Sequence, residues 1–171
     1  MSVDSASFRR ALGQFASGVT VLSTRGSDGR PLGLTVSSFC SVSLHPPLVL
    51  ACVDRRSDAN DGMRASGRFG VSILAEDQEE VSRRFATSGR RKFQETTLVE
   101  GRHGIPLVAG ALAHLECRVR SFHEEGDHTV WVGEVVALSA HPGRPLVYQA
   151  GAYRRFAMES SRAGASGPDR V

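Results

Sequence analysis

Apolar and polar positions alternate along much of this chain in short runs, separated by a few stretches with helical spacing. Runs with a period of two, or continuously apolar runs bounded by turn residues, are typical of β-strands. The turn sequences Asp28-Gly29 and Gly126-Asp127 predict β-hairpins. Strands are predicted over residues 18–25, 31–39, 48–54, 70–74, from 111 onward, 128–140 and 145–149.

Three segments predict helices. In residues 5–17, apolar side chains recur every three or four positions. A second helix is predicted over 57–67, although Gly62 weakens it by ~1 kcal/mol relative to alanine. The third, over 75–86, has acidic residues in its first turns and arginines in its last, an order that suits the helix dipole. The polar, glycine-bearing segment 87–104 predicts a long surface loop, and such loops are often functional.

This order of elements predicts a mainly β fold with helices, in which mostly antiparallel strands close into a barrel covered by two to three helices. Closure into a barrel removes exposed sheet edges. Strand and helix alternate only around residues 48–85, and no GxGxxG follows a strand, which argues against a dinucleotide-binding doubly wound sheet. We expect one domain over 1–156, followed by a small, polar and disordered tail over 157–171.

Composition and charge argue against several classes of partner. The chain has 171 residues and a formal net charge of +3, but its basic residues are scattered and not interleaved with aromatic side chains, so we expect no nucleic-acid partner. No apolar run approaches the ~18 residues that span a bilayer, and the N-terminus lacks a secretory pattern, so we expect no membrane association. Cys40, Cys52 and Cys117 lie among apolar residues, which favours buried thiols in a reducing, cytoplasmic compartment.

Two stretches combine small polar groups with turns. Thr35, Ser37 and Ser38 place hydroxyls at a strand end, where backbone groups also become free, and this mixture suits the polar edge of a planar heterocycle. Gly126-Asp127-His128 places a histidine at a hairpin, where it could bond a carboxamide or stack on a ring. Taken singly, solvated hydroxyls and an exposed turn histidine are the commoner interpretations. The histidines show no paired ligand spacing, so no metal site is predicted.

Two basic stretches have the chemistry of a phosphate site. Residues 54–57, Asp-Arg-Arg-Ser, precede a helix, whose free N–H groups combine with a hydroxyl and arginines. Ser57 as a plain helix N-cap is an equally good interpretation. In residues 90–93, Arg-Arg-Lys-Phe, the cations could reach a phosphate, and the phenylalanine could cover an apolar ring of the ligand. A run of charged residues is more often a solvated surface.

Taken in order, these stretches resemble the short-chain flavin reductases, the small components of two-component flavin-dependent monooxygenases. The likeness runs from about Phe8 to Phe156. Its residues are FRRALGQFASGVTVLST, GLTVSSFCSVSLHPPLVLACV, ASGRFGVSILAEDQEEVSRRFA with KF downstream, GDHTVWVGEV and PLVYQAGAYRRF. The chain departs from the family at Val36-Ser37, where Ala-Asn or Cys-Asn/Gln is frequent, at His45, where an acidic residue is frequent, and at Ala75, where serine is frequent.

The resemblance implies an FMN-binding split β-barrel, antiparallel and Greek-key-like, that forms a homodimer with flavin at or near the subunit interface. It assigns the isoalloxazine ring to Thr35, Val36, Ser37 and Ser38. It assigns the ribityl-phosphate side to Cys52, Val53, Asp54 and Ser57, and the phosphate to Lys92 and Phe93. The resemblance implies that the nicotinamide nucleotide is faced by Gly126, Asp127, His128, Tyr153 and Arg154.

The implied activity is reduction of FMN or FAD by NADH or NADPH, with hydride passing from nicotinamide C4 to flavin N5 and reduced flavin passing to a partner monooxygenase. Family habit favours NADH. His128 is expected to position the nicotinamide, because hydride transfer needs no general base. The alternatives are a flavin-binding electron carrier or sensor that does not turn over, and an oxidase of a phosphorylated vitamin on a similar barrel. The oxidase needs more phosphate-binding lysines and arginines at fixed strand positions, and none are recognised in this chain.

Overall fold

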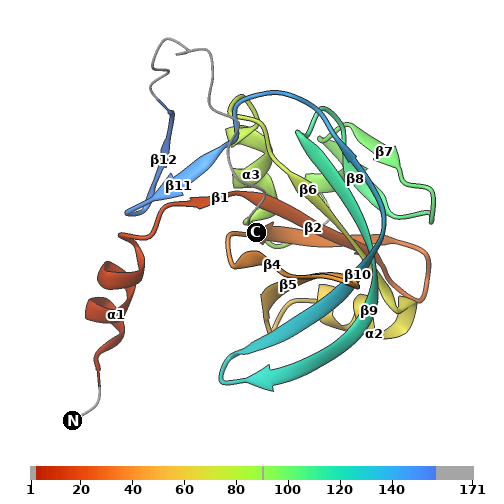
Figure 1. Cartoon of the computed structure of the whole chain (residues 1–171), viewed down its shortest axis with the longest axis horizontal. Coiled ribbons are helices and arrows are strands. Elements are labelled where there is room, and N and C mark those ends of the chain that lie inside the picture. The colour runs from red at the N-terminus through yellow and green to blue at the C-terminus, as the bar shows by residue number, and fades with distance from the viewer. Residues whose placement is uncertain (1–2, 90, 157–171) are drawn as a thin grey trace.

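One seven-stranded antiparallel sheet forms most of the structure, a computed structural model that describes residues 3–89 and 91–156 (Figure 1). Its strand order is β3-β2-β6-β9-β10-β5-β4. The bounds are Thr20–Arg25 (β2), Pro31–Val36 (β3), Phe39–Leu44 (β4), Pro47–Asp54 (β5), Arg68–Ile73 (β6), Ala113–Glu125 (β9) and His128–Ala140 (β10). The two edge strands follow one another in the chain, so the sheet curls into a barrel that is split at Ser37 and Ser38. The predicted antiparallel barrel is confirmed.

Helices and two small β units surround this barrel. The helices are α1 (Ser5–Leu12), α2 (Ala59–Ser66), α3 (Glu79–Phe85) and α4 (Arg91–Gln94). A three-stranded sheet combines β1 (Ser17–Gly18), β11 (Val147–Gln149) and β12 (Ala152–Arg154), and a hairpin combines β7 (Leu98–Glu100) and β8 (Pro106–Val108). Figure 1 shows α2 and α3 against the barrel, whereas α1 projects away from it. None of the helices described is long and apolar enough to cross a bilayer.

Several predicted boundaries are wrong. The helix predicted over 5–17 ends at Leu12, because the chain then turns into β1. The strand predicted over 31–39 is two strands, since β3 pairs with β2 while β4 pairs with β5. The loop predicted over 87–104 contains α4 and β7. The predicted tail over 157–171 lies outside the described residues.

Two apolar clusters stabilise the barrel. The first fills its interior, where Phe69 and Trp131 are fully buried and Met63 of α2 is packed among them. The second lies under α3, where Phe85 packs with Val21 and Leu74. Because α2 and α3 each contribute a core residue, the helix ends near the barrel opening are held rigidly.

The cysteines do not share one environment. Cys117 is fully buried, and burial raises the pKa of its thiol to about 12. Cys52 is half-buried, and Cys40 is exposed on the edge strand β4, so the prediction of three buried thiols is wrong for Cys40. Its apolar neighbours along the chain, Val42 and Leu44, are exposed as well, which explains why apolar surroundings in the sequence did not predict burial.

Candidate functional site

A cleft of about 610 Å³ lies where the end of β5, the start of α2 and the segment between α3 and α4 meet. Leu34, Phe85 and Ala86 line it with apolar surface, and most of the other lining residues are polar. Three predicted site residues line this cleft, namely Asp54, Ser57 and Lys92. Its volume lies within the roughly 300–1,000 Å³ typical of ligand pockets. The structure therefore brings the two predicted phosphate-binding stretches together.

Lys92 reaches the cleft from the single turn of α4. Its Nζ donates a hydrogen bond to the carbonyl of Thr87 at 3.0 Å. The side chain is half-buried, and this burial lowers the pKa of Lys92, while the nearby charge of Asp58 acts in the opposite direction. The next residue, Phe93, packs edge-on against Phe85 of α3 with ring centroids 5.0 Å apart. That contact fixes α4, and with it the position of the ammonium group.

The turn between α3 and α4 contributes residues that sequence reasoning missed. Thr87, Ser88 and Gly89 line the cleft beside Lys92. The Thr87 hydroxyl donates to the Arg84 carbonyl at 2.7 Å, which terminates α3, and Gly89 has a φ of 102° that favours glycine. Small hydroxyl residues and a glycine directly before a run of cations were the signal that could have identified this turn.

At the other wall, the carboxylate of Asp54 accepts from the backbone N–H of Arg56 at 2.9 Å and from its guanidinium at 2.7 Å. These bonds hold the pKa of the Asp54 carboxyl well below its usual range. The Asp54 carboxylate therefore neutralises Arg56, and this guanidinium is engaged within the protein. Ser57 uses its hydroxyl to accept from the N–H of Ala59 at 3.3 Å, at the start of α2.

Asn60 is a second residue that sequence reasoning missed. Its amide nitrogen donates to the carbonyls of Asp54 at 2.8 Å and Ser57 at 3.1 Å. Its amide oxygen accepts from the indole N–H of Trp131 at 2.9 Å. The buried side chain thus ties the cleft wall to the barrel core, and only the fold reveals this bridge.

The hairpin residues 126–128 lie next to the same wall. His128 of β10 pairs with Asp54 of β5, and the carbonyl of Asp127 accepts from the N–H of Arg55 at 3.0 Å. The ring Nδ1 of His128 lies 2.7 Å from a carboxylate oxygen of Asp127. This contact lowers the pKa of the Asp127 carboxyl. The predicted nucleotide-facing turn and the predicted phosphate side therefore adjoin.

The predicted ring-contact residues lie around the split between β3 and β4. Ser37 is exposed and lies outside both strands. The Ser38 hydroxyl donates to the carbonyl of Cys52 at 3.0 Å, and the Cys52 N–H donates to the carbonyl of Ser38 at 3.1 Å. The side chains of Val36 and Val53 are buried in the core, so only their backbone groups remain for a ligand.

Two further predicted residues meet on α3. The Thr35 hydroxyl donates to the Ser82 carbonyl at 2.7 Å, and the Tyr153 hydroxyl lies 2.8 Å from the Ser82 hydroxyl. The guanidinium of Arg83 lies 4.9 Å from the Tyr153 ring centroid. Arg154 is exposed on β12. Through these contacts Thr35 and Tyr153 hold α3 in place, and the C-terminal end of α3 lines the cleft.

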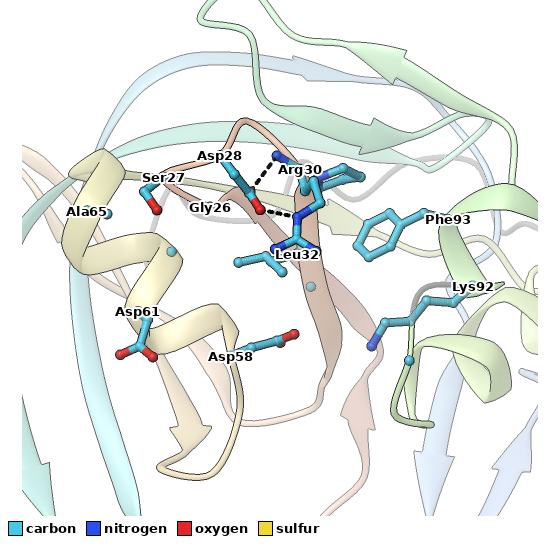
Figure 2. Close-up of a pocket in the computed structure, with 14 residues that line it drawn as sticks. Gly26, Ser27, Asp28, Arg30, Leu32, Asp58, Asp61, Ala65, Lys92 and Phe93 are labelled. Atoms are coloured by element: carbon cyan, nitrogen blue, oxygen red, sulfur yellow. Dashed lines mark hydrogen bonds and ion pairs between the residues drawn. The ribbon is translucent and has the colours of Figure 1, made fainter.

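A smaller cavity of about 260 Å³ adjoins the cleft and shares Asp58, Gly89 and Lys92 with it. Figure 2 shows Lys92 and Phe93 on one side of this cavity and the acidic residues of the α2 region on the other. The combined arrangement offers a cation, hydroxyls and exposed strand-end residues. It can hold and orient a polar, phosphorylated ligand.

Comparison with known proteins gives this geometry a family. Residues 12–157 match the flavin reductase-like domain. The chain belongs to this family. The resemblance inferred from the sequence motifs is thereby confirmed, and the family's domain covers the cleft, the split in the barrel and the hairpin 126–128 together.

Relatives in the flavin reductase-like family match along nearly their whole length. The structure of Streptomyces globisporus C-1027 NADH:FAD oxidoreductase SgcE6, in complex with NAD and FAD fragments, has a TM-score of 0.87 and 41% identity, covering 92% of this chain and 96% of that one. The FMN reductase (NADH) SmoA of Agrobacterium fabrum is 40% identical over 156 residues, or 91% of this chain and 88% of SmoA. The monooxygenase reductase subunit HsaB of Mycobacterium tuberculosis is 41% identical over 154 residues, which cover 88% of this chain and 82% of HsaB.

Proposed function

We propose that this chain reduces FMN or FAD with NADH or NADPH and supplies the reduced flavin to a partner monooxygenase. The observation that carries the proposal is the cleft that Lys92, Ser57 and the turn 87–89 line together. This donor set fits a flavin phosphate, because an ammonium and neutral hydroxyls line the cleft, the Asp54 carboxylate is engaged by Arg56, and the charge of Asp58 favours the protonated, cationic form of Lys92. Family membership and the names of the relatives support the same activity.

The residues of this chain bind and orient the reactants. When bound, a flavin accepts at N5 the hydride released from nicotinamide C4, so the cofactors supply the chemistry. Lys92 and Ser57 hold the phosphate, and Asn60 keeps the turn that carries Ser57 in place. With a proton on Nδ1 shared with Asp127, His128 presents Nε2 as an acceptor for the nicotinamide amide.

The proposal includes a homodimer. Helix α1 buries none of its residues, and Phe8, Leu12 and the following Phe15 are all more than half exposed. Exposed apolar side chains in such a row mark an interaction surface. A second copy covers this surface in the proposed assembly. The double substitution Phe8→Ser and Phe15→Ser should convert the dimer to a monomer in sedimentation experiments, whereas the exposed polar pair Arg9→Ser and Arg10→Ser should not.

We also place the chain in the cytoplasm. Its three cysteines are free, and an exposed thiol such as Cys40 persists best in a reducing compartment.

The activity is tested by following the absorbance of NADH and NADPH while FMN or FAD is added to the purified protein under anaerobic conditions. Flavin-dependent oxidation of nucleotide is the expected result. Flavin binding without nucleotide oxidation would contradict the proposal and favour an electron carrier or sensor. Transfer of the reduced flavin is then tested by adding monooxygenase protein, still without oxygen, and measuring how much reduced flavin it binds.

A further inference from the structure

The hairpin of β9 and β10 ends in a turn, and a charged network holds this turn to helix α2 (Figure 1). The carboxylate of Glu124, close to the turn, forms ion pairs with Arg55 at 3.1 Å and with Arg64 at 3.0 Å. Arg55 lies between β5 and α2, and Arg64 lies on α2. An isolated exposed ion pair contributes little to stability, whereas several charges in one network can hold a geometry. Glu124 is the centre of such a network, because it contacts both arginines.

Arg55 also binds the turn itself. Its backbone N–H donates to the carbonyl of Asp127 at 3.0 Å, and its guanidinium donates to the carbonyl of Gly126 at a longer 3.5 Å. Its neighbours Asp54 and Arg56 line the cleft, but Arg55 is not among the described residues that do so. The cation of Arg55, which the sequence placed in a phosphate-binding stretch, is therefore engaged by the hairpin.

Arg64 adds contacts with two aromatic rings of the hairpin. Its guanidinium lies 4.2 Å from the ring centroid of Phe122 and 5.7 Å from that of Trp131. These two rings are cross-strand neighbours on β9 and β10, with centroids 4.8 Å apart. A guanidinium near an aromatic face is attracted to the ring electrons. Since Met63 anchors α2 in the barrel core, Arg64 connects a firmly packed helix to the strands that lead into the turn.

The orientation of His128 depends on this turn. Pairing between β10 and β5 extends as far as His128 and Asp54, and the turn lies beyond it. The ring Nδ1 of His128 contacts the carboxylate of Asp127 at 2.7 Å, but the Asp127 side chain is 94% exposed and so has almost no packing of its own. The backbone at Gly126 and Asp127, which Arg55 binds, therefore determines where this carboxylate and the imidazole ring point.

We propose that Glu124, Arg55 and Arg64 are positioning residues for the nicotinamide nucleotide. They fix the turn at residues 126–127 and thereby aim Nε2 of His128 at the nicotinamide amide. They act through His128 and are not catalytic residues. The proposal rests on the proposed function, because that function assigns the amide contact to His128.

A purely electrostatic role for Glu124 would have the opposite effect. Without this carboxylate, Arg55 and Arg64 carry uncompensated positive charge, which attracts the phosphates of the nucleotide and lowers the KM for NADH. Loss of a positioning role raises the KM instead, because the nucleotide then has to order the turn when it binds. The direction of the change in KM therefore separates the two roles.

The test is Glu124→Gln in the full chain, which removes the charge and keeps the size of the side chain. We expect the KM for NADH to rise about three- to tenfold, while the flavin dissociation constant stays within about twofold. The matched control is Glu134→Gln, which breaks the 3.0 Å ion pair with Arg118 on the same two strands, away from the turn. The control should change neither constant. An unchanged or lower KM in Glu124→Gln would overturn the proposal.

Combination with His128→Ala shows whether Glu124 acts through the histidine. If it does, the double variant should have the KM of His128→Ala alone, because there is no longer an imidazole to position. A general structural defect would instead raise the KM further by the factor seen in the single Glu124 variant. Such multiplication of the two effects would overturn the positioning role.

Hydrogen exchange of the Arg55 backbone N–H follows the turn without flavin or nucleotide. This group donates to Asp127, so it should exchange faster in Glu124→Gln and at the original rate in Glu134→Gln. An unchanged rate in Glu124→Gln would overturn the proposal whatever the KM. If the rate rises but the wild-type protein oxidises no NADH with either flavin, the proposed function is refuted and the network still holds the turn.

Discussion

Replacing Asn60 by alanine tests whether the cleft wall is held from inside the barrel. The Asn60 side chain makes three hydrogen bonds, to Trp131, Asp54 and Ser57, and only 4% of the residue is exposed. The truncation leaves the buried indole N–H of Trp131 without its partner, at a cost of about 1–3 kcal/mol. With the two bonds to the turn also lost, we expect the free energy of unfolding to fall by about 2–4 kcal/mol.

Urea unfolding measures this loss, and Trp131 fluorescence reports it because the chain has a single tryptophan. The matched control is Trp131→Phe, alone and combined with Asn60→Ala, followed by circular dichroism. Since each single substitution breaks the same bond, the double variant should cost about 1–2 kcal/mol less than the sum of the two. Flavin affinity should weaken in Asn60→Ala as well. If the free energy of unfolding of Asn60→Ala fell by less than about 0.5 kcal/mol, or if the effects of the two substitutions simply added, the Asn60 hydrogen bonds would not be what holds the cleft wall to the core.

Three further predictions concern individual site and core side chains, the first of them a pair. Lys92→Met combined with Ser57→Ala should weaken FMN binding by about tenfold or more in fluorescence titrations and barely affect riboflavin, with Arg120→Met as the exposed-cation control. Unchanged FMN affinity would remove both residues from the site. His128→Ala should raise KM for the nucleotide by about tenfold and leave flavin affinity nearly unchanged; equal losses of both would argue against its role. Because burial raises the pKa of the Cys117 thiol to about 12, it should resist alkylation at pH 8 until urea is added, and modification of Cys117 in the native protein would contradict its burial.

The regular strands were predictable because their patterns are local. The alternation through 113–125 and 128–140 and the glycine turn between them identify the long hairpin of β9 and β10 directly. Helix α2 ends where predicted, since Gly67 adopts a φ of 63° at its C-terminus. Such signals depend only on neighbouring residues in the chain.

The missed elements depend on distant contacts. The segment joining β7 to β8 is anchored by the buried carboxylate of Glu116, which accepts from the N–H groups of Arg102 and His103 at 2.8 Å each. Nothing in the local pattern of 98–108 indicates this partner. Helix α4 is one turn long and is held by the contact of Phe93 with Phe85, so helical periodicity could not reveal it.

The candidate site was predictable as a set of residue types and less so as a set of contacts. Motif order identified Ser57 and Lys92, which the fold places in one cleft. It could not show that the hydroxyl of Thr35 is committed to Ser82, or that Asp54 is engaged by Arg56, because both partners are chosen by tertiary packing. Asn60 carries no motif signal at all.

The helicity of the exposed N-terminal helix should depend on the protein concentration. Helix α1 has eight residues, buries none of them and is supported by local contacts such as the Asp4 cap, and isolated helices below about 12–15 residues are marginal in water. In the proposed homodimer, the second copy supplies the surface that stabilises the helix over residues 5–12. Helix formation and subunit association would then be one transition for this segment, and dilution should unfold it while the barrel stays folded.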